Sequence, residues 1–132
     1  MEYFMDVELN VNELSIQMAN KLLEYGALNV QVIQTQDKSK IAKRLVICTA
    51  QANPIAKKMA IELKEFFKPM IQSLHTDGMI KGEWIVIDYK DIIVHIFTKQ
   101  ARLKYNLEKL WKDSKSTTIL EPNQLTIDSL CE

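Results

Sequence analysis

The side chains of this sequence that could do chemistry gather in one stretch, residues 82–97. Two carboxylates, Asp88 and Asp91, and an imidazole, His95, stand close together there. Carboxylates can hold a divalent metal ion, and imidazole, which titrates near neutrality, can serve as a general base or a ligand. Trp84 and Phe97 add rigid aromatic area to the same stretch. The stretch therefore offers material for either catalysis or recognition.

Residues 82–97 are predicted to form a β-hairpin, because two apolar runs flank a polar turn. An even number of residues in the connection, with Asp88 facing Asp91, separates the side chains by alternation. One side is then purely aliphatic and must be core, comprising Ile85, Ile87, Ile92, Val94 and Ile96. The other side mixes aromatic, acidic and imidazole groups, which buried faces rarely do, and comprises Trp84, Val86, Asp88, Asp91, Ile93, His95 and Phe97.

The mixed side of the hairpin has two interpretations. It is either a surface built to meet a partner, which we favour, or a second buried layer beneath a helix, which would also need apolar side chains. For His95 itself, a hydrogen bond to a neighbouring side chain is the expected state in the middle of a strand, ahead of a role as general base or ligand.

Metal binding and nucleotidyl transfer are both disfavoured. The side chains considered as metal ligands are Cys48, His75, His95 and Cys131. They lack any paired spacing such as Cys-x-x-Cys or His-x-x-x-His. Nucleotidyl transfer would need a Gly-Ser turn and two carboxylates spaced by one residue to hold magnesium and the triphosphate, whereas this chain has Asp88-x-x-Asp91 and no Gly-Ser pair. We expect no cofactor and no metal.

The composition limits the partners. A chain of 132 residues is expected to be one domain with a sizeable core. Its 17 basic and 17 acidic side chains cancel, so no global field attracts nucleic acid. Any RNA contact must be local, and the candidates are Lys40, Lys43 and Arg44 around a basic connector over residues 37–43, which is otherwise a solvated loop.

The cellular compartment is expected to be the cytoplasm. Cys48 lies inside an apolar run and Cys131 near the end of the sequence, so we expect both to be reduced thiols. The first residues lack the basic and apolar regions of a secretory signal, and no apolar run approaches the ~20 residues that a membrane helix needs.

Periodicity places the other elements. A helix is predicted over residues 11–25, capped by Asn10 with Glu13 and stopped by Gly26. Strands are predicted over 29–35 and 44–49. Asn53 as the N-cap and Pro54 at the first helical position start a second helix that Pro69 ends or kinks, with an apolar face of Ile55, Met59, Leu63, Phe66 and Met70. Asp77-Gly78 marks a turn, residues 98–105 are helical, and a further helical segment starts at Asn106.

This order of elements predicts an α/β (α+β) single domain, in which a four-stranded, mixed sheet has helices on its core face. We expect the domain to span residues 1–111. Residues 112–132 are dominated by Ser, Thr, Pro and Asn, with scattered apolar residues, and are expected to form a loosely attached tail.

Three motifs closely resemble the ribosomal silencing factor family, also called the Iojap-related family. They are Gly82-Glu-Trp-Ile-Val-Ile-Asp-Tyr89, Asp91-Ile-Ile-Val-His-Ile-Phe97 and Tyr105-Asn-Leu-Glu-Lys-Leu-Trp111. The resemblance extends more weakly back to about residue 10. It departs from the family pattern at Lys43-Arg44-Leu45 and at residues 50–54, around the second strand.

The resemblance implies a fold similar to nucleotidyltransferases but without their catalysis, and a homodimer when free. Members of the family bind the large ribosomal subunit at ribosomal protein fourteen, on the face that meets the small subunit. The bound factor sterically blocks subunit joining and damps translation when nutrients are scarce. A nucleotidyltransferase-like enzyme and an RNA-binding ribosome assembly factor are the alternatives.

Carried onto this sequence, the motifs indicate a partner-binding site of Trp84, Asp88, Tyr89, Asp91, His95, Phe97, Tyr105, Asn106 and Trp111. The aromatic members supply anchors that bury large area with few rotors to freeze. Asp88 and Asp91 supply charge complementary to a basic ribosomal protein. Trp111 is either core or partner-facing, and Tyr105-Asn106 could equally mark a helix start.

Overall fold

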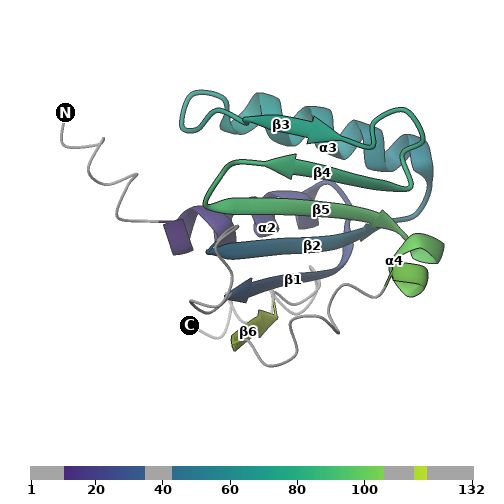
Figure 1. The fold of residues 1–132 in the computed structure, drawn as a ribbon, viewed down its shortest axis with the longest axis horizontal. Helices are drawn as coiled ribbons and strands as arrows, with labels where there is room; N and C mark the ends of the chain where they lie inside the picture. Colours follow the sequence, from purple (N-terminus) through teal and green to yellow (C-terminus); the bar gives the residue numbers. More distant parts are fainter. Residues whose placement is uncertain (1–10, 35–42, 106–114, 119–132) are drawn as a thin grey trace.

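A computed structural model describes residues 11–34, 43–105 and 115–118 of the chain (Figure 1). The helices are α2 (Val11–Glu24), α3 (Asn53–Phe67) and α4 (Lys99–Tyr105). The strands are β1 (Leu28–Gln34), β2 (Arg44–Ala50), β3 (His75–Asp77), β4 (Trp84–Asp88), β5 (Ile92–Thr98) and β6 (Lys115–Thr118).

The described residues form one mixed sheet in the order β3-β4-β5-β2-β1-β6. β2 and β5 run parallel, while the other neighbours are antiparallel. The mixed character and the four central strands are as predicted, but the number four was wrong, because the described part of the chain has six. The two missed strands lack an apolar signal, since β3 has only three residues and β6 reads Lys-Ser-Thr-Thr.

Helix α2 forms much as predicted and packs on the sheet. Leu14, Met18 and Leu22 recur every fourth residue and are buried. The helix ends in a Schellman-type turn, in which Gly26 has φ 98°, its N–H donates to the Leu23 carbonyl, and the N–H of Ala27 donates to the Leu22 carbonyl. The predicted cap, Asn10, lies outside the described residues.

The predicted start of α3 was wrong in detail. Asn53 is already helical and Ala52 takes the N-cap position, so Pro54 lies one place further into the first turn than predicted. The Asn53 side chain does not cap the helix, because its Nδ2 donates to the Lys81 carbonyl at 2.8 Å. As predicted, the helix ends before Pro69, at Phe67.

The predicted apolar face of α3 was half right. Met59 and Leu63 are buried, but Ile55, Phe66 and Met70 are 38%, 46% and 40% exposed. The face that meets the sheet is completed by small or later residues instead, Ala56, Ala60 and Phe67. Ile55 and Phe66 lie at one edge of the predicted stripe, away from the side that carries Ala56, Ala60 and Phe67, and Met70 lies beyond the end of the helix at Phe67.

The hairpin of β4 and β5 has the predicted alternation but a different turn. Asp88 pairs with Ile93 and not with Asp91, because the turn lies further along the chain, where the Tyr89 N–H is bonded to the Ile92 carbonyl. Lys90 accommodates the reversal with φ 81°. Because this shift is by two residues, side chains keep their sides, and the aliphatic set is core.

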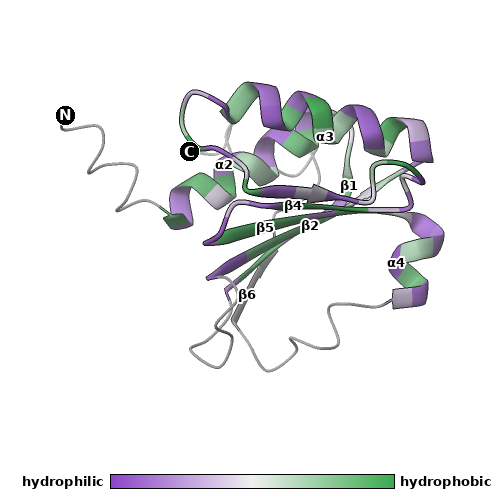
Figure 2. Cartoon of the chain, turned by 45° about the horizontal axis from the view of Figure 1, so that its top comes forward, coloured by the Kyte–Doolittle hydropathy of each residue, from purple (hydrophilic) through white to green (hydrophobic). Residues whose placement is uncertain are grey.

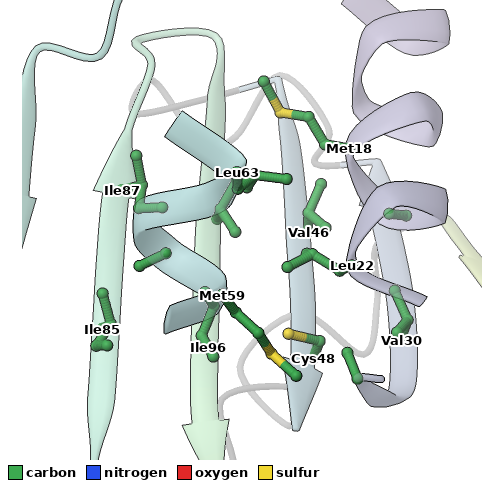
Figure 3. Close-up of a cluster of buried hydrophobic side chains, with 14 of the residues drawn as sticks. Met18, Leu22, Val30, Val46, Cys48, Met59, Leu63, Ile85, Ile87 and Ile96 are labelled. Atoms are coloured by element: carbon green, nitrogen blue, oxygen red, sulfur yellow. The ribbon is translucent and has the colours of Figure 1, made fainter. Parts of the chain in front are cut away.

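The core lies between the sheet and the helices α2 and α3. Figure 3 shows Met18 and Leu22 from α2 and Met59 and Leu63 from α3 over Val46, Cys48, Ile85, Ile87 and Ile96 of the sheet. Helix α4 departs from the prediction that the helices share this core face. It follows β5 on the side of the sheet away from α2 and α3 (Figure 2). There it buries Ala101 in a separate cluster with Ile33, Leu45, Ile47, Ile93 and Phe97.

Residues 115–118 belong to the sheet, although they fall within the predicted tail. They form β6, which pairs antiparallel with β1 from Gln31↔Thr118 to Gln34↔Lys115. The division of the chain after residue 111 thus stays a prediction, and any such division separates β6 from the strand it pairs with.

Candidate functional site

The candidate site lies where the hairpin meets α4. Trp84 opens β4 opposite Phe97, near the end of β5, and Val86 pairs with His95. Alternation sends the side chains of Trp84, His95 and Phe97 to the side of the sheet away from α2 and α3. Because α4 begins directly after β5 (Figure 1), its last residue, Tyr105, lies beside Trp84.

Four of the predicted residues meet there around the Trp84 indole. Its Nε1–H donates a hydrogen bond of 3.0 Å to Nδ1 of His95. Its ring stacks on Phe97 with centroids 5.1 Å apart, and lies 4.7 Å from the Tyr105 ring at an interplanar angle of 41°. Such contacts hold an aromatic side chain in one orientation, each worth about 1 kcal/mol beyond burial. We call Trp84, His95, Phe97 and Tyr105 the aromatic cluster.

His95 is the buried hydrogen-bond acceptor of the cluster. It is 8% exposed, and burial lowers the pKa of its imidazole to about 4. At neutral pH the ring is therefore uncharged, with Nδ1 free of a proton and able to accept the indole N–H. The expected hydrogen bond of His95 to a neighbour is confirmed, and the neighbour is the Trp84 side chain.

The members of the cluster differ in exposure, so both interpretations of the mixed side apply, to different residues. Phe97 is fully buried and Ile93 is 8% exposed, as in a second buried layer. Trp84 is half-buried and Tyr105 is 43% exposed. The buried members can support a contact, and only the half-buried and exposed members can make one.

An apolar rim beside Trp84 was not predicted from the sequence. A groove of about 440 Å³ runs along the turn that precedes β4 and is lined by Thr76, Asp77, Gly78, Met79, Ile80, Lys81, Glu83, Trp84 and Tyr105. Ile80 is 92% exposed, and Leu103, on α4, is 83% exposed. Met79-Ile80 directly after the Asp77-Gly78 turn was the available signal, since large apolar residues are unusual in a turn.

Asp88 and Asp91 lie at the other end of the hairpin. Asp88 is four residues along β4 from Trp84, or about 13 Å at the rise of a strand. Its Oδ1 accepts the N–H of Lys90 at 2.7 Å, so the carboxylate stabilises the turn. The structure therefore does not bring the two carboxylates together with the aromatic cluster.

Tyr89 belongs to the opposite side of the sheet. It is 4% exposed within the main core, and burial raises the pKa of its hydroxyl to about 12. Within the described ranges this hydroxyl has no hydrogen-bond partner. Tyr89 is thus separated from Trp84 by the sheet itself.

The remaining predicted residues are mostly elsewhere. Asn106, Trp111 and Lys40 lie outside the described residues. Lys43 is exposed. Arg44 is held against the protein, since Nε donates to Oδ1 of Asn12 at 3.1 Å and Nη1 donates to the Lys43 carbonyl.

Fold and site together define a class, a small α+β protein with an aromatic surface suited to recognition. Within the three described segments, no group of three or more His, Cys, Asp or Glu side chains could hold a metal ion. No helix among these residues is long and apolar enough to cross a membrane.

Comparison with known proteins identifies the family. The family model described as "Ribosomal silencing factor during starvation" matches residues 8–129. A ribosomal silencing factor of Halalkalibacterium halodurans is 32% identical over 114 residues, covering 86% of this chain and 91% of that protein. The mitochondrial Iojap-related protein of Arabidopsis thaliana is 32% identical over 122 residues, covering 83% and 63%.

A crystal structure of a Chromobacterium violaceum protein has a similar fold, with a TM-score of 0.75 at 22% identity, over 78% of this chain and 87% of that one. The chain belongs to the ribosomal silencing factor family. The match continues well past residue 111, where the resemblance read from the motifs ended.

Proposed function

We propose that this protein binds the large ribosomal subunit at ribosomal protein fourteen and sterically blocks joining of the small subunit. Contact is made by Trp84, Tyr105 and Ile80, which we call the contact surface. The observation that carries the proposal is a tryptophan held by three neighbours beside an exposed apolar rim, in a chain of the ribosomal silencing factor family.

The contact surface has the properties of an interface anchor. Trp84 is oriented by a hydrogen bond and two ring contacts before any partner arrives, so binding freezes few rotors. Ile80 leaves 92% of its surface in water, which a partner would remove. His95 and Phe97 support this surface from below, since both are buried.

Asp88 and Asp91 form a separate contact in this proposal. Both are half-buried at the turn end of the hairpin. From there they can meet basic side chains of the ribosomal protein at the rim of the interface, which favours association rate more than affinity. We infer that the protein acts by occupancy and not by catalysis, in keeping with a family whose model is described as a silencing factor.

The test compares exposed apolar residues on two faces. Ile80→Asp and Tyr105→Ala change side chains that are 92% and 43% exposed, so both variants should fold. In co-sedimentation with purified large subunits, each should bind at least about tenfold more weakly, because an interface anchor is lost. Ile61→Asp is the matched control, since Ile61 is 54% exposed on α3, across the sheet, and should bind like the wild type.

The outcomes test the proposed function and the contact surface separately. Wild-type protein that fails to sediment with large subunits, or that leaves their joining with small subunits unchanged, would refute the proposed function. Wild-type affinity of both Ile80→Asp and Tyr105→Ala would refute the contact surface alone. Sedimentation of the free protein reports on the expected homodimer. Co-sedimentation with large subunits at several salt concentrations reports on a local ribosomal RNA contact at Lys43.

A further inference from the structure

Helix α4 has little hydrophobic attachment to the rest of the protein. It spans seven residues, and Ala101 is its one buried side chain. Helices this short are not stable by themselves and depend on tertiary contacts. Since Tyr105 is the last residue of α4, the contacts that hold this helix also decide where Tyr105 lies relative to Trp84.

Arg102 supplies the contact that ties α4 to the sheet. Its Nη1 donates hydrogen bonds to the carbonyl of Asn29 and, at 2.9 Å, to Oγ1 of Thr49. The two acceptors belong to β1 and β2, so one guanidinium group spans both strands. Hydrogen bonds from a charged donor are stronger than neutral ones.

The acceptor on β1 is presented by an irregularity of the strand. The pairing of β1 with β2 shifts register between Leu28 and Gln31, and Asn29 within this bulge has φ 49°. Bulges commonly re-aim groups near functional sites. The acceptor on β2, Thr49, pairs with Phe97 of the aromatic cluster and is 1% exposed.

We propose that Arg102 is a positioning residue for the contact surface. By clamping α4 to Asn29 and Thr49, it holds Tyr105 against the Trp84 ring. This inference rests on the proposed function for its effect on ribosome binding, whereas its effect on α4 can be measured on the free protein. Without the clamp, α4 would sample other positions and Tyr105 would leave Trp84, so the partner would have to order both.

Thr49 offers the sharper test, because it is buried, uncharged and unable to touch a partner. Thr49→Val keeps the shape and removes the acceptor, while Thr49→Ser keeps the hydroxyl. We expect Thr49→Val to bind large subunits about threefold more weakly and Arg102→Met about tenfold more weakly. Thr49→Ser should stay within about twofold of the wild type, as should Lys99→Met, which removes an exposed positive charge from the same helix.

Three measurements on the free protein separate positioning from general destabilisation. Hydrogen exchange of residues 99–105 should be faster in Thr49→Val and Arg102→Met. The Trp84 indole N–H resonance, assigned with Trp84→Phe, should shift in the direction that Tyr105→Leu produces. Urea unfolding of each variant reports whether the protein as a whole has been weakened.

Each possible outcome supports or overturns the positioning role of Arg102. If exchange in α4 and the indole resonance are unchanged in Arg102→Met and Thr49→Val, the clamp does not position Tyr105 and the inference is overturned. If they change while the wild type itself does not bind large subunits, the proposed function fails and the clamp stands. Should Arg102→Met not fold, the comparison of Thr49→Val with Thr49→Ser decides alone.

Discussion

At the scale of single residues, the central feature is the hydrogen bond from Trp84 to His95. An uncharged imidazole accepts the indole N–H through Nδ1, whereas an imidazolium has donors at both nitrogens and cannot accept. Protonation of His95 therefore breaks the bond that orients Trp84. Burial opposes this protonation by lowering the pKa of the ring to about 4.

This lowered pKa makes the stability of the protein depend on pH. Unfolded His95 titrates near 6.5 and folded His95 near 4, so the unfolded state binds more protons between these values. The contribution is full above pH 6.5 and is lost as pH falls toward 4. We expect this group to remove about 2 kcal/mol of unfolding free energy between pH 7 and pH 5, measured by urea unfolding.

Substitutions at the two histidines isolate the effect. His95→Gln can still accept the indole N–H but does not titrate, so its loss of stability between pH 7 and pH 5 should be about 2 kcal/mol smaller than that of the wild type. His75→Gln, which removes the exposed imidazole on β3, is the matched control for the substitution itself. Identical pH dependence in wild type and His95→Gln would contradict the assignment.

At the scale of elements, the turn between β3 and β4 positions Trp84. Gly78 has φ 85°, and a Cβ atom there would lie 2.0 Å from the Trp84 carbonyl oxygen. The close approach of the two backbones thus requires glycine, for its conformation and for its lack of a side chain. The same turn carries Ile80, so its geometry sets the positions of both Trp84 and Ile80 in the contact surface.

Substitution of this glycine should damage stability and binding together. Gly78→Ala adds steric overlap with backbone to the strain of a positive φ, and we expect a loss of about 3 kcal/mol or more in unfolding free energy. Gly26→Ala is the matched control, since Gly26 has φ 98° but an added Cβ would meet nothing within 4 Å. It should lose only about 1–2 kcal/mol.

The two glycine variants also differ in their expected effect on ribosome binding. Folded Gly78→Ala should sediment less with large subunits, because the Trp84 backbone must move, whereas Gly26→Ala should bind normally. Equal losses of stability in the two variants would show that the approach to Trp84 is not constraining. Normal binding by Gly78→Ala would show that the turn does not position the contact surface.

At the scale of the whole molecule, the sheet joins distant parts of the sequence. β6 pairs with β1 through a ladder from Gln31↔Thr118 to Gln34↔Lys115. Each net backbone hydrogen bond contributes about 1 kcal/mol at most, against the entropy of ordering the strand. β6 therefore adds modest stability, and it covers an edge of β1 that would otherwise be open to other chains.

Two truncations test whether the domain ends at residue 111. Removal of residues 112–132 deletes β6, whereas removal of residues 119–132 keeps it. We expect the shorter protein to be about 1–3 kcal/mol less stable than the longer one by urea unfolding, with faster hydrogen exchange in β1. Equal stability and equal exchange would support the predicted division after residue 111.

Much of the fold was readable from local patterns. The helix over Val11–Glu24, the strand over Arg44–Ala50 and the aliphatic side of the hairpin follow from spacings within one element. Those patterns are strong because an element that buries one side must repeat apolar residues at its own period. The pairing of the hairpin strands was misplaced by two residues, since alternation has the same parity in both registers.

The sequence by itself determined the family, the two helices on the core face and the residues Trp84, His95, Phe97 and Tyr105, because these are carried by motifs within short stretches. Only the tertiary structure decided which of them are exposed, that the Tyr105 ring lies 4.7 Å from the Trp84 ring, and that Arg102 reaches Asn29 and Thr49. Exposure and contacts between distant strands depend on how elements pack, and no local period records that packing.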